Sequence, residues 1–235
     1  MTPSRIPLLL CSLLLCPPAM PQPTKDVPFD DHPYGDAIAE MAERGILQGY
    51  PDSTARALQP MTRYEFAAAW ARLCDTLGLH ADAPSLQGMV TDVPVDHWAR
   101  QSIESLAALG LLPVLPDPDV DPLHWAAAGV AAVAIEPPRG PGHLLYQGER
   151  VLLRREYIEM LFRTCQAAAK QGLGPLTPGD LVGIGPAEFA TQHRIIRGMP
   201  DPADLTRERL GLDDPMLRGS FCAATTRLLD WWARP

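Results

Sequence analysis

Arginine recurs at the start of three stretches that are predicted to form helices. The stretches read MTRYEFAAAWARLC, LLRREYIEMLFRTC and MLRGSFCAATTRLLDWW, and they align Arg63 with Arg154 and Arg218. The first turn of a helix favours anions, because its backbone N–H groups are free and the helix dipole is positive there. A guanidinium can also hold a carboxylate through two parallel hydrogen bonds. The arginines therefore indicate anion sites, with a solvated surface charge as the simpler alternative for each.

The helices that must position these arginines carry clear start and core signals. Thr62 and Glu65 have the spacing of a capping box. An aromatic residue follows each arginine by three positions, and a cysteine or leucine follows it by eleven, which predicts one buried stripe per helix. The two sets are Phe66, Tyr157 and Phe221, and Cys74, Cys165 and Leu229. We therefore expect the cysteines, Cys222 included, to be buried thiols and not a disulfide or metal pair.

A second set of repeated segments precedes these helices. The segments KDVPFDDHPYGDAIAEMAERGILQGYPD, TDVPVDHWARQSIESLAALGLLPVLPD and GDLVGIGPAEFATQHRIIRGMPD place Asp31, Asp96 and Asp180 in register. His32 and His97 also recur, which indicates a shared structural or groove role. Each unit therefore has the order helix, turn, loop and helix, and the chain contains three such units.

Composition and motifs argue against several classes of function. The chain has 235 residues, 46% of them hydrophobic and 20% charged, and a net charge of −8. This acidity argues against a protein that coats nucleic acid or anionic lipid, since both need a basic surface. The histidines form no H-E-x-x-H pattern, and there is no G-x-S-x-G elbow or glycine-rich phosphate loop. We therefore expect no enzyme activity, no metal site and no cofactor.

The first 23 residues are predicted to be a signal peptide. Arg5 is followed by an apolar run from Ile6 to Cys16, which is too short to span a bilayer. Prolines then end the run, so we expect residues 1–23 to be removed and the protein to be exported, with no transmembrane segment in the mature chain. Lipid attachment at Cys11 or Cys16 is a less favoured alternative, because Leu precedes both.

The repeated motifs resemble those of a known family, the S-layer homology (SLH) repeat. The similar stretches are DVPVDHWARQSIESLAALGLL, GILQGYPD and MTRYEFAAAWARL. The resemblance implies a mainly α fold in which three helix-loop-helix repeats pack in a pseudo-threefold assembly. We assign the repeats to residues 24–85, 86–172 and 173–235. The second repeat contains an insertion at about 118–150, which we expect to form a short strand or hairpin.

The resemblance also implies a set of ligand contacts. SLH repeats attach exported proteins noncovalently to cell-wall polysaccharide, often to a sugar with a negative pyruvyl ketal, in grooves between adjacent repeats. The implied ligand-binding residues are Arg63, Arg154, Arg218, Asp31, Asp96, Trp98 and Asp180. Trp98 would stack on a sugar ring and the aspartates would accept hydrogen bonds from hydroxyl groups. Packing of Trp98 between repeats, and helix capping by the aspartates, are open alternatives.

The sequence therefore predicts a non-catalytic anchoring module that binds an anionic, for instance pyruvylated, polysaccharide of the cell envelope. The expected location is the cell surface, or the periplasm where an outer membrane exists, and other envelope proteins are further possible partners. The alternative is a protein–protein interaction or assembly module that has lost glycan binding. Pro33 and Val182, which stand where the family has Trp, favour this alternative.

Overall fold

The protein is mainly α-helical, as the sequence predicts. The structure is a computed structural model, and it describes residues 32–81, 90, 92–112, 115–116, 144–201 and 204–234. The signal-peptide prediction and Asp31 lie outside these residues. The helices of the described part are α1 Gly35–Glu43, α2 Arg63–Thr76, α3 Arg100–Ala108, α5 Arg154–Lys170, α6 Pro186–Gln192, α7 Arg218–Trp232 and a short 3-10 helix, η1 Pro178–Leu181. None of them is long and apolar enough to cross a bilayer.

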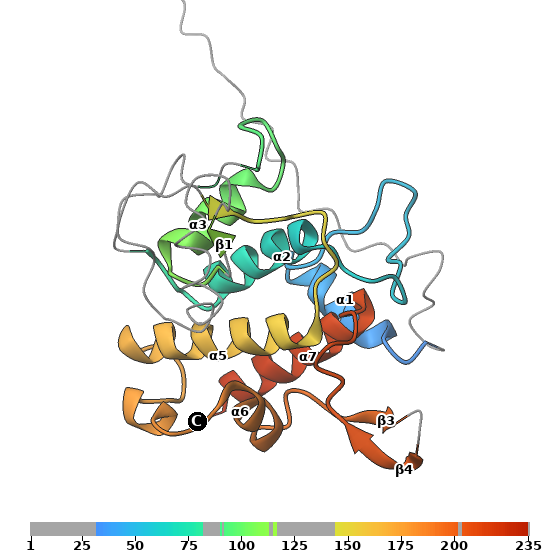
Figure 1. The fold of residues 1–235 in the computed structure, drawn as a ribbon, viewed down its shortest axis with the longest axis vertical. Coiled ribbons are helices and arrows are strands. Elements are labelled where there is room, and N and C mark those ends of the chain that lie inside the picture. Colours follow the sequence, from blue (N-terminus) through green and yellow to red (C-terminus); the bar gives the residue numbers. More distant parts are fainter. Residues whose placement is uncertain are drawn as a thin grey trace, which may run out of the picture.

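The three longest helices, α2, α5 and α7, meet in the middle of the molecule (Figure 1). Their aligned aromatic residues Phe66, Tyr157 and Phe221 are fully buried and pack edge to face, with ring centroids 5.9 to 6.4 Å apart. This geometry suits the positive edge and negative face of aromatic rings. Trp70 completes the cluster, and its indole nitrogen donates to the Thr164 hydroxyl at 2.9 Å. The predicted buried stripe is therefore confirmed.

The shorter helices connect the units in a cycle. Helix α3 packs on α2, α6 packs on α5, and α1 packs on α7. Each first helix therefore contacts the second helix of the preceding unit, and the contact between α1 and α7 closes the cycle. In an isolated unit, each helix would lack the helix of the neighbouring unit against which it packs. The pseudo-threefold symmetry and the assigned repeat boundaries stay predictions.

A closed set of backbone hydrogen bonds lies just before the three long helices. Met61 N donates to Met216 O, Met216 N donates to Leu152 O, and Leu152 N donates to Met61 O, each at 2.8 Å. All three residues are buried, so these bonds satisfy backbone groups that water cannot reach. Isolated antiparallel bridges flank them between Pro60 and Leu217, Thr62 and Val151, and Leu153 and Pro215.

Two small antiparallel pairs of strands complete the described fold. Strand β1 (Leu115–Pro116) pairs with β2 (Leu144–Leu145), and β2 lies within the predicted insertion. Residues 117–143 between them are outside the described part of the chain. Strand β3 (Met199–Asp201) pairs with β4 (Asp204–Arg209) in the third unit, where the repeat pattern predicts only a loop.

Candidate functional site

The side chain of Arg218 is buried and directed at the loop of the first unit. Its Nε donates to Ala55 O at 2.9 Å, its Nη2 donates to Gln48 O at 3.1 Å, and its Nη1 donates to Glu65 Oε1 at 3.1 Å. The guanidinium also lies 4.6 Å from the ring centroid of Tyr50. Only 3% of Arg218 is exposed. These contacts offset the cost of burying a charge and tie the last helix to the first unit.

Arg154 of the second unit binds backbone carbonyls of the third unit in the same way that Arg218 binds those of the first unit. Its Nε donates to Leu210 O at 2.8 Å and its Nη2 donates to Arg197 O at 3.0 Å. Arg154 is 5% exposed, and burial lowers the pKa of its guanidinium. Ser220 of the third unit aligns with Glu65 of the first unit. Arg154 therefore has no carboxylate in the place that Glu65 takes beside Arg218.

Arg63 lies against the second unit. Its Nε is 3.9 Å from Glu156 Oε1, and its guanidinium lies 4.7 Å from the ring centroid of Tyr146. The Tyr146 hydroxyl donates to the backbone carbonyl of Arg63 at 2.5 Å, and Arg150 also pairs with Glu156. Arg63 is 1% exposed, and burial lowers its pKa. The alternative of a solvated surface charge is therefore wrong for all three arginines.

The first amides of the long helices are also occupied. In each helix the first two N–H groups donate to backbone carbonyls of another unit, at 2.8 to 3.0 Å. The pairs are Arg63 with Arg150, Tyr64 with Gly148, Arg154 with Asp214, Arg155 with Leu212, Arg218 with Gln59, and Gly219 with Ala57. The predicted capping box is present, because Thr62 Oγ1 accepts from Glu65 N and Glu65 accepts from Thr62 N. The chain itself therefore takes the amides that the helix-dipole argument assigns to an anion.

A group of aromatic rings reaches the surface between α2 and α3. The ring of Tyr64 is 4.1 Å from that of His97 and 6.3 Å from that of Trp98, centroid to centroid. Tyr64 is buried beneath the group, whereas Trp98 is 61% exposed and Val95 is 87% exposed. We call Tyr64, Val95, His97 and Trp98 the α2–α3 aromatic surface. Of the predicted contacts, Trp98 and Asp96 lie in an exposed position here, and the Trp98 ring also packs edge to face against Tyr64 of the preceding unit.

Gly148 allows the aromatic surface to form. Its backbone carbonyl accepts from Tyr64 N, and a Cβ atom at Gly148 would lie only 2.0 Å from the Tyr64 ring. The repeated motifs do not single out either residue. In the sequence, Tyr64 is one more residue of an amphipathic helix, and Gly148 is part of an insertion. Tyr64 is aromatic at the second helix position, whereas the aligned residues are Arg155 and Gly219. This difference is the sequence signal that could have identified Tyr64.

His32, His97 and Asp180 of the repeated segments serve local geometry. The Nδ1 atoms of His32 and His97 accept from the backbone N–H groups of Tyr34 and Ala99, which confirms a shared structural role. The carboxylate of Asp180 accepts from Thr177 N and Thr177 Oγ1, and these bonds lower its pKa. Asp180 therefore caps the start of η1. Whether any of the seven predicted ligand residues contacts a ligand stays a prediction.

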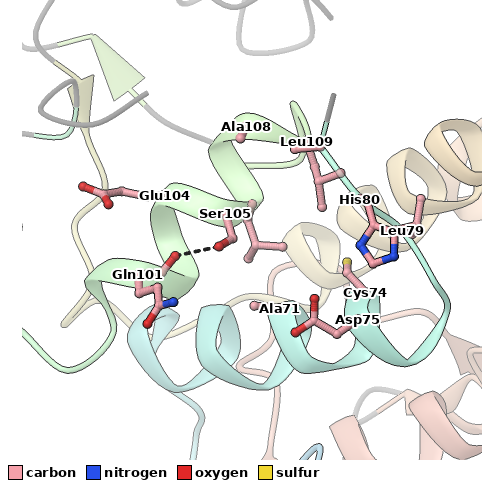
Figure 2. Close-up of a pocket in the computed structure, with 12 residues that line it drawn as sticks. Ala71, Cys74, Asp75, Leu79, His80, Gln101, Glu104, Ser105, Ala108 and Leu109 are labelled. Carbon is pink, nitrogen blue, oxygen red and sulfur yellow. Dashed lines mark hydrogen bonds between the residues drawn. The ribbon is translucent and has the colours of Figure 1, made fainter. Parts of the chain in front are cut away.

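A pocket of about 350 Å³ lies between α2 and α3, away from the long-helix starts (Figure 2). Figure 2 shows Asp75 and His80 on one side of it and Gln101 and Ser105 on the other. The Ser105 hydroxyl donates to the carbonyl of Gln101 in its own helix, and burial raises the pKa of the Cys74 thiol to about 12. Neither group is an activated nucleophile.

The cysteines behave as the sequence predicts. Cys74, Cys165 and Cys222 are buried and free, and burial raises the pKa of each thiol to about 12. The described residues contain no group of three or more side chains that could hold a metal ion.

Comparisons with known proteins point to one family. Residues 25–67, which include α1 and the start of α2, match the S-layer homology domain. The outer membrane protein SlpA of Deinococcus radiodurans is 38% identical over 78 residues, which are 32% of this chain and 6% of that protein. The cellulosome-anchoring protein of Acetivibrio thermocellus is 31% identical over 107 residues, which are 45% of this chain and 24% of that protein.

The chain thus spans no more than about a quarter of either relative. Residues 25–67 match the S-layer homology domain, the family that the sequence motifs of the first unit resemble.

Proposed function

We propose that this protein is a non-catalytic module that anchors at the cell envelope by binding a wall polysaccharide through the α2–α3 aromatic surface. The observation that carries the proposal is the exposure of Trp98 beside Tyr64 and His97, in a chain with an S-layer homology domain. The flat face of an exposed indole suits the apolar face of a sugar ring. The names of the two relatives, an outer membrane protein and a cellulosome-anchoring protein, support an envelope location.

The arginines have an indirect part in this proposal. Arg154 and Arg218 direct their donors at backbone carbonyls, and Arg63 lies against Glu156 and Tyr146. They hold the units together and thereby fix the loops that carry the binding surface. Direct contact of Arg63, Arg154 or Arg218 with an anionic sugar would require these buried side chains to become exposed.

A wall-binding assay with a matched pair of variants tests the proposal. Purified walls are incubated with the wild-type chain, with Trp98→Ala and with Val182→Ala, and the bound fraction is measured by sedimentation. Val182 aligns with Trp98 and is 81% exposed, so its replacement controls for loss of an exposed apolar residue. We expect Trp98→Ala to weaken binding at least tenfold and Val182→Ala to change it less than twofold.

The same assay separates the glycan from a protein partner. Walls are compared before and after chemical removal of their polysaccharide, with the other components retained. Loss of binding after this treatment supports the proposal. Equal retention by stripped walls would refute glycan binding and favour the assembly module, for which Val182 offers an exposed apolar contact.

A further inference from the structure

We propose that the pocket between α2 and α3 is a second subsite for the wall polysaccharide and binds an N-acetylated pyranose unit. This inference rests on the function proposed above, in which another unit of the same polymer covers the α2–α3 aromatic surface. It concerns the unit in the pocket alone, so it holds whether or not other units of the polymer carry a charge.

The pocket and the aromatic surface lie along the same two helices. On α2, Tyr64 is followed after seven and eleven residues by Ala71 and Asp75, which line the pocket. These intervals are close to whole numbers of helical turns, so the three residues share one face of α2. Trp98 stands just before α3, and Gln101 of α3 lines the pocket. At 1.5 Å of rise per residue, Ala71 and Asp75 lie about 10 and 16 Å along α2 from Tyr64, a separation that a short oligosaccharide can span.

The buried part of the pocket lining is apolar. It consists of Ala71, Cys74, Leu79 and Leu106. Burial raises the pKa of the Cys74 thiol to about 12, so this part of the lining carries no charge at neutral pH. A methyl group that enters the pocket would leave water for apolar surface, which favours binding, whereas a hydroxyl group in the same place would lose its hydrogen bonds to water.

Exposed polar side chains border the pocket from both sides (Figure 2). Asp75 and His80 lie on one side, and Gln101 and Ser105 lie on the other. The carboxylate of Asp75 can accept a hydrogen bond from an amide N–H, and the side-chain amide of Gln101 can donate one to an amide carbonyl. The backbone at His80 is held in place, because its carbonyl accepts from Gln171 Nε2 at 3.0 Å.

An acetamido group on a sugar ring matches this lining. Its methyl group suits the apolar part, its N–H can donate to Asp75, and its carbonyl can accept from Gln101. Glu104 also lines the pocket, but its carboxylate pairs with Arg100 at 2.8 Å. The volume of about 350 Å³ is at the small end of the range for ligand sites, which suits a single sugar ring with its substituent. A hydroxyl group at the same ring carbon supplies no methyl group, so we expect it to be a weaker ligand.

Two matched tetrasaccharides test the inference. Chitotetraose carries an acetamido group at C2 of each unit where cellotetraose carries a hydroxyl group, and the two are otherwise identical. Each is titrated into the ¹⁵N-labelled full chain and followed by NMR. The indole N–H signal of Trp98, assigned with Trp98→Phe, reports the aromatic surface, and the side-chain amide signal of Gln101, assigned with Gln101→Ala, reports the pocket. We expect chitotetraose to shift both signals and to bind at least tenfold more tightly than cellotetraose.

A variant of the pocket border provides the decisive comparison. Asp75→Asn combined with Gln101→Ala should reduce the preference for chitotetraose at least fivefold, and both residues are exposed, so the fold should be retained. The matched control is Asp230→Asn, because Asp230 is the exposed residue of α7 that aligns with Asp75. This control should leave the preference unchanged.

The outcomes separate this inference from the proposed function. Equal affinity for the two tetramers, a Trp98 shift without a Gln101 shift, or no shift with either tetramer would overturn the pocket assignment and leave wall anchoring in place. Wall retention that does not depend on Trp98 would instead overturn the proposed function.

Discussion

Arg63 and Tyr64 are neighbours in the sequence, yet they serve two different regions of the molecule. Arg63 is buried at the junction of two units, where it contacts Glu156 and Tyr146. Tyr64 packs against the rings of His97 and Trp98, which reach the surface. The first region is closed to solvent and internally paired, and the second is open and presents apolar area to solvent.

The two regions also differ in how they recur along the chain. Arg63 has buried counterparts in Arg154 and Arg218, which tie other pairs of units together. Tyr64 aligns with Arg155 and Gly219, which are not aromatic. The repeated residues therefore build the architecture, and the residues that differ between units distinguish one surface from another. The following predictions test this division, from the largest expected effect to the smallest.

Removal of a buried arginine should have the largest effect. Arg218→Ala leaves Glu65 and the carbonyls of Ala55 and Gln48 without this donor, so we expect a loss of about 3–5 kcal/mol in the free energy of unfolding. Urea unfolding followed by circular dichroism measures it. Arg155→Ala, which removes an exposed pair with Asp213, should cost less than about 1 kcal/mol. Equal losses in the two variants would contradict a special role for the buried position.

Alkaline pH should have the second largest effect, by lowering the free energy of unfolding through the buried thiols. The folded-state pKa of Cys74, Cys165 and Cys222 is about 12, above the ordinary value of 9.0. A raised folded-state pKa contributes stability that is fully present below pH 9 and is lost as the pH rises toward 12. We expect each thiol to lower the free energy of unfolding by about 1.4 kcal/mol at pH 10 relative to pH 8. Urea midpoints between pH 8 and 10.5 check this slope, and a flat profile would refute it.

Gly148→Ala should disturb the contact between the two regions. The new Cβ atom would collide with the Tyr64 ring, and relief of this overlap should cost about 1–3 kcal/mol of stability and displace the aromatic surface. The matched control is Gly185→Ala, because a Cβ atom there meets nothing within 4 Å. Thermal unfolding gives the stability, and the indole signal of Trp98 reports the displacement. An unchanged signal with an unchanged melting temperature would show that Tyr64 is not held by this glycine.

Trp98→Ala should have the smallest effect on folding. The side chain is mostly in solvent, so we expect a change of less than about 0.5 kcal/mol in the free energy of unfolding, alongside the loss of wall binding proposed above. Trp70→Ala is the contrasting variant, because Trp70 is fully buried and should cost about 3–5 kcal/mol. A large loss of stability in Trp98→Ala would assign this tryptophan to the architecture instead.

Local patterns predict the parts of the fold that depend on neighbours in the sequence. The capping box of Thr62 and Glu65 and the buried positions of Phe66 and Cys74 follow from helical spacing alone. The contacts of Arg218 do not, because its partner Ala55 is 163 positions away. Helical periodicity reports which face is apolar and does not report which carbonyls of another unit reach the helix start.

The candidate site is also predictable from the sequence only in part, because residues from separate segments come together to form it. Trp98 is a candidate because the repeated segment places an indole there, and the structure exposes it. Tyr64 is not a candidate from the sequence, because its position depends on Gly148 and His97, which come from separate segments. The charges near Tyr64 are equally hidden from sequence reasoning, since Asp92 and Glu149 approach it only in the folded chain.

The closed cycle of units has a mechanical consequence for a protein that is anchored at the cell envelope. Tension on α7 cannot peel this helix away alone, because Met216 is bonded to both Met61 and Leu152 and Arg218 is bonded to the first unit. The contact between α1 and α7 must also be lost. These interactions would rupture together, so the module should resist force up to one high threshold and then open in a single step.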